Sequence, residues 1–318
     1  MESALSHFTF AQFQFVLKAQ ENICLPAYKG STFRGAFGHA FKRVVCVNRE
    51  KICEPCLLKG KCVYSYIFET PPPPETLKMR KYPFAPHPFV ITPPLEEKRT
   101  YRQNEALSFE LTLIGKSTDF LPYFIYTFDE LGRMGIGKGK GKYQLEEVKA
   151  INKNEGEGMI YSGKDKTLRN NFSILKVDDL GPFSVSPLTL RLSFLTPTRL
   201  KYDGKLSPDL EFHILFRNLL RRISLLSYFH CGEELNLDFK GLIEEAKDVK
   251  VQKENLRWVD WERYSNRQET KMKMGGFIGS VTFTGNFKEF LPFLILGEYI
   301  HVGKGTSFGL GKYKILRD

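Results

Sequence analysis

Two segments of the sequence decide the fold: FLPYFIYTFDELGRMGIGKGKGKY at residues 120–143 and FLPFLILGEYIHVGKGTSFGLGKY at residues 290–313. They match without a gap at a constant offset of 170 residues (290 − 120), and both open with Phe-Leu-Pro and close with Gly-x-Gly-Lys-Tyr. A fixed offset over the whole segment indicates a duplicated domain. We therefore expect two homologous halves, each ending in a helix, a glycine-rich loop and a strand.

The two halves also begin alike. Apolar residues alternate with polar ones over residues 8–17 and again over 190–194, which predicts a strand at the start of each half. Apolar residues then recur every three or four positions over residues 33–44 and 212–226, which predicts amphipathic helices. A strand, a helix, further strands, a second helix and a final strand in each half predict an α+β fold of two tandem ferredoxin-like domains.

The predicted domain boundaries follow from this duplication. We place an N-terminal domain at residues 1–151, a linker rich in Asn, Gly, Asp and Lys at 152–187, and a C-terminal domain at 188–318. The prolines between Pro71 and Pro94 exclude regular structure and predict an insertion in the first domain. Residues 256–287 predict a β-hairpin that bends near Gly275-Gly276.

Length and charge restrict the class of protein and its partners. The chain has 318 residues, of which 42% are apolar, enough for sizeable cores. Its 47 Lys and Arg against 36 Asp and Glu leave a net charge of +11, which favours nucleic acid, and less strongly an anionic membrane surface. The N-terminus lacks the pattern of a signal peptide, and the longest apolar run, residues 290–296, is too short to cross a bilayer. We expect a cytoplasmic protein without a membrane span.

Four of the six cysteines are clustered, as Cys46, Cys53, Cys56 and Cys62. The Cys53-Glu-Pro-Cys56 pair is typical of a knuckle that binds one metal through two thiolates, and four thiolates complete a tetrahedral site. We predict a structural zinc site in the first domain, with a 4Fe–4S cluster or four free thiols as alternatives. Because four protein ligands leave no open position, we expect the metal to have no catalytic role.

Both glycine-rich loops carry cations. Such loops can bring backbone amides and positive charge onto phosphates, although glycines in these places can also serve only the tight turn from helix to strand. Neither loop has the spacing of a nucleotide-triphosphate loop, so no nucleotide cofactor is expected. The predicted nucleic-acid-binding residues are Arg133, Lys138, Lys140 and Lys142 in the first loop and Gly303, Lys304, Gly305, Ser307 and Phe308 in the second.

A second candidate for a nucleic-acid surface lies on the first strand of the predicted hairpin. Period two places Arg263, Ser265 and Arg267 on one face. Two arginines flanking a serine suit a sugar–phosphate backbone. The alternative is that these arginines pair with neighbouring acids on a solvated face.

Two motifs add a family resemblance to this interpretation. The residues YKGSTFRGAFG at 28–38 and HVGKGTSFGLG at 301–311, together with the duplicated halves, resemble the CRISPR-associated RAMP proteins. Within them the chain is similar to the endoribonucleases that process precursor crRNA, the family numbered six among Cas proteins. The resemblance covers essentially the whole chain and implies two ferredoxin-like (RAMP/RRM-like) domains in a prokaryotic protein. It further implies binding of CRISPR repeat RNA, by residues that include Arg34, and metal-independent cleavage within the repeat.

The chemistry of such a cleavage needs few groups. RNA supplies its own nucleophile in the 2′-hydroxyl, so a base, an acid and a cation near the phosphate suffice, and the products are a 2′,3′-cyclic phosphate and a 5′-hydroxyl. His39 is one candidate, because it lies on the polar face of the first helix with Lys42 at i+3 and Arg43 at i+4. His301, directly before the second glycine loop, is the other, and the resemblance suggests Tyr28 and Lys42 as partners.

Some alternatives remain open from the sequence. The 170-residue offset pairs His301 with Leu131, so the duplication does not require a histidine in the first half. Histidines with a smaller claim to catalysis are His7, His87, His213 and His230. A non-catalytic RAMP subunit that binds crRNA beside other subunits of an effector complex would use the same basic surface. A zinc-stabilised scaffold for protein partners would instead show no RNA affinity at moderate salt.

Overall fold

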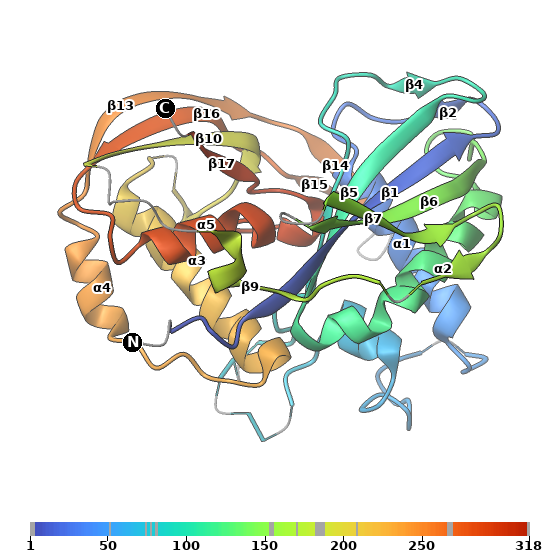
Figure 1. Cartoon of the computed structure of the whole chain (residues 1–318), viewed down its shortest axis with the longest axis horizontal. Helices are drawn as coiled ribbons and strands as arrows, with labels where there is room; N and C mark the ends of the chain where they lie inside the picture. Colours follow the sequence, from blue (N-terminus) through green and yellow to red (C-terminus); the bar gives the residue numbers. More distant parts are fainter. Residues whose placement is uncertain are drawn as a thin grey trace. The chain divides into compact units, whose positions relative to one another are not determined.

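The computed structural model describes residues 4–50, 52–73, 75–76, 78–79, 82–152, 156–169, 171–181, 188–207, 209–265 and 270–316. The chain forms two compact units (Figure 1). The N-terminal unit comprises Phe8–Leu175 and Leu225–Glu233, and the C-terminal unit comprises Met1–His7, Lys176–Ser224 and Glu234–Asp318. No helix in the described ranges is long and apolar enough to cross a membrane.

The N-terminal unit is built on an antiparallel sheet. Its main elements are β1 (Thr9–Ala19), α1 (Gly30–Val45), β3 (Phe89–Thr92), β5 (Ala106–Ile114), α2 (Leu121–Met134) and β6 (Tyr143–Asn152). The strands lie in the order β3-β5-β1-β6, β7 (Gly156–Ser162) and β8 (Thr167–Leu168) extend the sheet beyond β6, and β9 (Leu175–Lys176) pairs with β1. The smaller elements are β2 (Ile23–Cys24), β4 (Thr100–Tyr101), η1 (Ser65–Glu69), η2 (Gly115–Phe120) and η4 (Ser227–Cys231).

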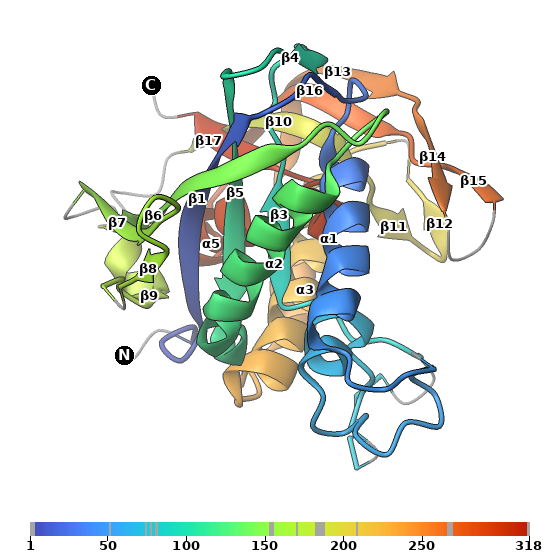
Figure 2. The same cartoon turned by 90° about the vertical axis from the view of Figure 1, so that its right-hand side faces the viewer.

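Phenylalanine rings form the core of this unit. Helices α1 and α2 lie side by side over one face of the sheet (Figure 2). Phe37 of α1 is fully buried, and its ring centroid lies 4.9 Å from that of Phe124 and 5.2 Å from that of Phe128, both on α2. It also packs 5.8 Å from Phe89 on β3. The three-and-four spacing predicted for residues 33–44 is therefore the buried face of α1.

The C-terminal unit repeats this arrangement. Its main elements are β10 (Thr189–Thr198), α3 (Phe212–Leu226), β13 (Lys250–Val259), β16 (Gly276–Thr284), α5 (Leu291–Ile300) and β17 (Tyr313–Leu316). The antiparallel sheet has the order β13-β16-β10-β17. The smaller elements are η3 (Val177–Leu180), β11 (Lys201–Tyr202), β12 (Lys205–Leu206), α4 (Phe239–Glu245), β14 (Glu262–Ser265), β15 (Thr270–Lys273) and η5 (Thr306–Phe308).

Both units thus share one order of elements and one sheet order. Counted along the chain, the four main strands of each sheet lie in the order second, third, first, fourth. The mixed fold of strands and helices agrees with the prediction, and both predicted opening strands and both predicted helices are present.

Three predictions about connecting segments were wrong. The segment from Pro71 to Pro94 was predicted to lack regular structure, but its residues Phe89–Thr92 form β3 and pair with β5. Residues 152–187 are not simply a linker. They contain β7, which pairs with Glu147 to Asn152 of β6 and so adds a strand to the N-terminal sheet. The hairpin does not bend at Gly275-Gly276: Gly276 already pairs with Val259, and the two strands that pair with each other before these glycines are β14 and β15. In the latter two segments the paired strands follow each other in the chain, and their pairing overrides the local turn composition.

The boundaries of the units also differ from the predicted 1–151 and 188–318. The first seven residues group with the C-terminal unit, and Leu225–Glu233, which follow most of α3, group with the N-terminal unit. In the N-terminal unit a Cβ at Gly115 would meet the backbone of His230, so this exchanged segment is closely packed. Sequence composition does not record such an exchange, because it depends on packing between residues far apart in the chain.

Candidate functional site

Helix α1 places one histidine and two cations on its outer face. Phe33, Phe37 and Phe41 are buried, and His39 is exposed because it lies about half a turn from this stripe. In the described part of the chain the imidazole of His39 has no hydrogen-bond partner. Lys42 and Arg43 follow in the last turn of α1. The outer face of α1 therefore presents an accessible imidazole with two cations within the next helical turn.

The predicted partners of His39 are only partly brought together. Lys42 is one turn away, and its Nζ lies 5.2 Å from the centre of the Tyr64 ring, which holds the ammonium near the helix surface. Tyr28 precedes the helix, whereas His39 is nine residues beyond Gly30, about 13 Å along the axis at ~1.5 Å per residue. Burial also raises the pKa of Tyr28 well above its ordinary value, so the phenol stays protonated. Tyr28 therefore does not form one cluster with His39 and Lys42.

Arg34 is engaged inside the N-terminal unit. Its Nη2 lies 3.0 Å from Nε2 of His87, and its guanidinium lies 4.0 Å from the centre of the Phe68 ring. The Nδ1 atom of His87 lies 3.1 Å from Oγ1 of Thr70, which donates to the carbonyl of Ala85 at 2.9 Å. Arginine can only donate, so Nε2 of His87 accepts and Nδ1 carries the proton. The prediction that Arg34 binds RNA is not supported by this arrangement, which anchors the proline-rich insertion to α1.

The first glycine loop leaves two of its four cations available. Arg133 pairs with Glu130 at 2.6 Å, and Lys142 pairs with Glu21 at 3.4 Å. Lys138 and Lys140 are exposed, and no side-chain partner is found for them among the described residues. Glycine itself is required here for packing, since a Cβ at Gly137, where φ is +78°, would collide with the carbonyl of Cys24. These glycines therefore permit the close packing of the turn, and Lys138 and Lys140 are the two cations of the loop for which no side-chain partner is found among the described residues.

The second glycine loop is more buried than predicted. Ser307 and Phe308 have exposed fractions of 6% and 9%, so in this conformation their hydroxyl and ring, which were predicted to contact RNA, are buried. Gly303 and Gly305 have φ values of +83° and +77°, which glycine adopts without strain. Lys304 is exposed, and it is the predicted residue of this loop whose side chain is accessible.

The structure reveals a shift that the ungapped repeat conceals. Helix α2 has 14 residues and α5 has 10, although both begin at equivalent positions. The glycine loop after each helix is closed by an equivalent backbone hydrogen bond. Ile136 N donates to the Gly141 carbonyl in the first loop, and Val302 N donates to the Gly311 carbonyl in the second, both at 3.0 Å. The first half therefore has one more helical turn and a loop four residues shorter.

This shift changes the partner of His301 in the repeat. Gly135 ends α2 with φ and ψ of 78° and 156°, and His301 ends α5 with 62° and 168°. The structural equivalent of His301 is thus Gly135, and the pairing with Leu131 was wrong. A residue other than glycine is strained at these φ and ψ values. We therefore infer that contacts of the His301 side chain offset this backbone strain.

The imidazole of His301 is enclosed at the end of α5. Its exposed fraction is 1%, and its Nδ1 lies 3.2 Å from the carbonyl of Leu310, which fixes the proton on Nδ1. Burial, with the nearby charges of Lys312 and Arg222, holds the pKa of His301 well below its ordinary value. The buried imidazole donates a hydrogen bond to the loop that follows it and so stabilises the conformation of this loop. This position argues against direct catalysis by His301.

Arg222 is a buried cation of the C-terminal unit that was not among the predicted site residues. This arginine of α3 is buried, donates from Nε to the carbonyl of Ile300 at 3.0 Å, and has its pKa lowered to about 9 by burial. Its Nη2 is buried without a partner among the described residues. The sequence signal was present: Arg222 is three residues after Leu219 and four before Leu226, on the apolar stripe of its helix.

The burial of His301 predicts a pH-dependent stability. Above pH ~6.5 the imidazole is neutral in both the folded and the unfolded protein. Below this pH the unfolded chain binds a proton that the folded chain does not, so the free energy of unfolding decreases as the pH decreases. The loss should approach about 1.4 kcal/mol per pH unit. We expect His301→Asn, whose amide can replace Nδ1–H and tolerates positive φ, to reduce the dependence of the Tm on pH between 7 and 5. An identical dependence in both proteins would contradict the assignment.

The remaining predicted residues lie in the predicted hairpin and in the cysteine cluster. Arg263 and Ser265 lie on β14, paired with Met272 and Thr270 of β15, while Arg267 lies outside the described residues. Among the described residues no three His, Cys, Asp or Glu side chains converge as metal ligands, so Cys46, Cys53, Cys56 and Cys62 do not form a preassembled site. The Cys56 amide donates to the Cys53 carbonyl at 3.2 Å, which is a turn at the predicted knuckle.

Comparison with known proteins places this geometry in a family. Residues 8–173, just over half of the chain, match the AF_1859_N family model, described as an N-terminal domain. Residues 192–313 match the model of the CRISPR-associated endoribonuclease Cas6. The chain belongs to the AF_1859_N family, and its residues 192–313 are similar to the Cas6 endoribonucleases. The resemblance inferred from the two motifs and the duplication is thereby confirmed.

Solved Cas6 structures have a similar fold, and one relative matches nearly the whole chain. A Thermus thermophilus Cas6 structure is similar with a TM-score of 0.54 and 18% identity, covering 97% of this chain and 99% of its own. A Cas6 product complex gives 0.59 and 17%, covering 96% and 100%. A partial Cas6-RT-Cas1–Cas2 complex gives 0.58 and 13%, covering 99% of this chain and 47% of its own. An uncharacterized protein of Archaeoglobus fulgidus is 25% identical over 301 residues, or 92% of each chain.

Proposed function

We propose that this Cas6-family chain is a metal-independent endoribonuclease that cleaves CRISPR repeat RNA in the precursor transcript and so produces mature crRNA. The observation that carries the proposal is the exposed His39 beside Lys42 and Arg43 on α1, in a chain with a Cas6 domain. We further propose that its two units are tandem ferredoxin-like domains, which their shared order of strands and helices supports.

In the proposed reaction His39 acts as the base. Its neutral imidazole takes the proton of a 2′-hydroxyl, the 2′ oxygen attacks the adjacent phosphorus, and the bond from phosphorus to the 5′ oxygen breaks. The 5′ oxygen leaves with a proton from solvent, giving a 2′,3′-cyclic phosphate and a 5′-hydroxyl. Lys42 and Arg43 stabilise the negative charge that develops on the phosphorane. A base and a positive charge are all that this chain's residues need to supply in this reaction.

Cations outside the helix are proposed to hold the rest of the RNA. Lys138 and Lys140 in the first glycine loop and Lys304 in the second are exposed. The net charge of +11 supports a polyanionic partner. Because such contacts release counterions, binding should weaken steeply with salt.

A second candidate function is that of a non-catalytic subunit that retains crRNA in a larger assembly. The likeness to a chain in a Cas6-RT-Cas1–Cas2 complex favours partners of this kind. It predicts salt-sensitive binding of repeat RNA without cleavage, whereas a protein scaffold would bind no RNA at moderate salt.

The test uses purified full-length protein with labelled repeat RNA from its own CRISPR locus, in EDTA. A matched substrate carries a 2′-deoxy group at the scissile position. Cleavage of the all-ribose RNA alone, with a cyclic phosphate product, is the expected result. Binding without cleavage would establish the crRNA-retaining subunit instead, and absence of binding would exclude both.

For the four cysteines we propose a structural zinc ion, with 4Fe–4S as the alternative. The spacing and the Cys53–Cys56 turn support it, and ligands that are apart can assemble when metal binds. We expect elemental analysis to find about one zinc per chain, lost in Cys56→Ser and retained in Cys24→Ser, a control outside the cluster. Iron with visible absorption would indicate the cluster, and no metal would leave four free thiols.

A further inference from the structure

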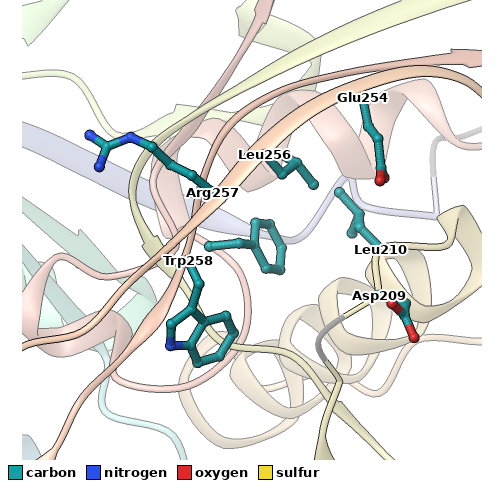
Figure 3. A pocket seen from close by; sticks show the side chains of 7 residues that line it. Asp209, Leu210, Glu254, Leu256, Arg257 and Trp258 are labelled. Atoms are coloured by element: carbon teal, nitrogen blue, oxygen red, sulfur yellow. The ribbon is translucent and has the colours of Figure 1, made fainter.

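The C-terminal unit contains a pocket that the proposed cleavage does not use. It lies between β13 and the residues that precede α3, and it has a volume of about 350 Å³, within the range of small-ligand sites. Figure 3 shows Leu210, Glu254, Leu256 and Trp258 around the hollow. All lining residues belong to this one unit. They are Asp209, Leu210, Glu254, Leu256, Arg257, Trp258 and Phe277.

The pairing of β13 with β16 places three of the lining residues on one face. Glu254, Leu256 and Trp258 alternate along β13 and lie opposite Val281, Gly279 and Phe277 of β16. Opposite Leu256 the two strands lie so close that a Cβ at Gly279 would meet the carbonyl of Asn255, and the φ of Gly279, +122°, is a conformation that other residues rarely adopt. Arg257 lies on the alternate face, and its guanidinium extends away from the hollow in Figure 3.

The walls of the pocket suit a flat, partly apolar ligand. Trp258 keeps an exposed fraction of 44%, large for a tryptophan. Its Nε1 donates to Oδ1 of Asp260 at 2.9 Å, which fixes the orientation of the indole. Leu210 and Phe277 are buried and supply an apolar floor. An aromatic ring with a fixed orientation is a stacking platform for a base.

The polar groups of the pocket are acceptors. Glu254 and Asp209 are exposed carboxylates that bracket the apolar floor, and no hydrogen bond or ion pair of either side chain is found among the described residues. An ionised carboxylate can only accept hydrogen bonds. Guanine presents two adjacent donors, N1–H and the 2-amino group, to one carboxylate. Adenine and cytosine present one amino group, and uracil presents two carbonyls flanking one N–H.

We propose that this pocket binds one unpaired guanine base of the RNA, stacked on Trp258 and read by Glu254, with Asp209 as a further acceptor. The inference rests on the proposed RNA-binding function and adds a site of base recognition to it. Arg257, turned outward, is placed to meet the backbone phosphate rather than the base. A lysine or arginine of a protein partner would also suit carboxylates and an indole, but the +11 charge and the Cas6 domain favour RNA.

The test uses the fluorescence of Trp258 in the full chain. The protein has two tryptophans, so Trp261→Phe leaves Trp258 as the single reporter. The probes are 2′-O-methyl pentanucleotides UUGUU, UUIUU, UUAUU, UUCUU and UUUUU, which this chemistry cannot cleave. We expect UUGUU to quench at the lowest concentration and inosine, which lacks the 2-amino group, to bind about tenfold more weakly. Glu254→Gln should remove the preference, whereas Asp248→Asn, at an exposed acid outside the pocket, should keep it.

Several outcomes would overturn the proposal. Equal quenching by all five probes means stacking without guanine recognition, and no quenching means that RNA does not enter. Quenching by acetyl-arginine methyl ester but not by RNA would assign the pocket to a protein partner. Because the probes cannot be cleaved, failure of the pocket is separate from failure of the nuclease, which the repeat-RNA assay reports. Circular dichroism and Tm of each variant establish that it is folded.

Discussion

Replacing His39 with alanine is expected to slow cleavage of repeat RNA by about 10²- to 10⁴-fold, the usual contribution of a general acid–base group. The imidazole is exposed and is not part of the core, so the fold should be retained. Lys42 and Arg43 remain, and so do the loop lysines, so the Kd for uncleavable 2′-deoxy repeat RNA should change little. Single-turnover cleavage rates and the Kd, measured on the same preparation, separate chemistry from binding.

The matched control is His213→Ala. His213 lies on α3 of the other unit, where its Nδ1 is 3.4 Å from Glu211. We expect this variant to cleave at the rate of the unmodified protein. If His39→Ala retains full activity, or loses activity only in proportion to a weaker Kd, His39 is a binding residue and another group supplies the base.

Replacing Phe37 with alanine is expected to lower the free energy of unfolding of the N-terminal unit by about 3–5 kcal/mol. Phe37 has no exposed surface and lies within ring contact of Phe41, Phe89, Phe124 and Phe128. Removing its ring leaves a cavity among rigid neighbours that cannot collapse to fill it. The measurement is denaturant unfolding of the full chain, followed by circular dichroism.

Tyr126 provides the control for this core prediction. It lies on α2, has an exposed fraction of 55%, and should change stability by no more than about 0.5 kcal/mol when replaced by alanine. The loss of unfolding free energy in Phe37→Leu should lie between the losses in Phe37→Ala and Tyr126→Ala, because leucine keeps most of the apolar volume. A loss below about 1 kcal/mol for Phe37→Ala would mean that α1 is not held by this aromatic cluster.

The sequence by itself determined the duplication, the opening strands and the apolar faces of the main helices. These features are local and periodic: a helix must bury residues three and four apart, and a half-buried strand must alternate. His39 could be placed on the outer face of α1 for the same reason. The two motifs and the repeat were also enough to recognise the Cas6 family.

Only the tertiary structure decided which of the predicted site residues are accessible. His301, Ser307 and Phe308 are buried, Arg34 is held by His87, and the repeat conceals a helix one turn longer and a loop four residues shorter in the first half. Burial and hydrogen bonding depend on neighbours distant in the chain, which no local pattern records. An ungapped alignment likewise cannot show where a helix stops, because the end of a helix depends on the contacts and hydrogen bonds that close it.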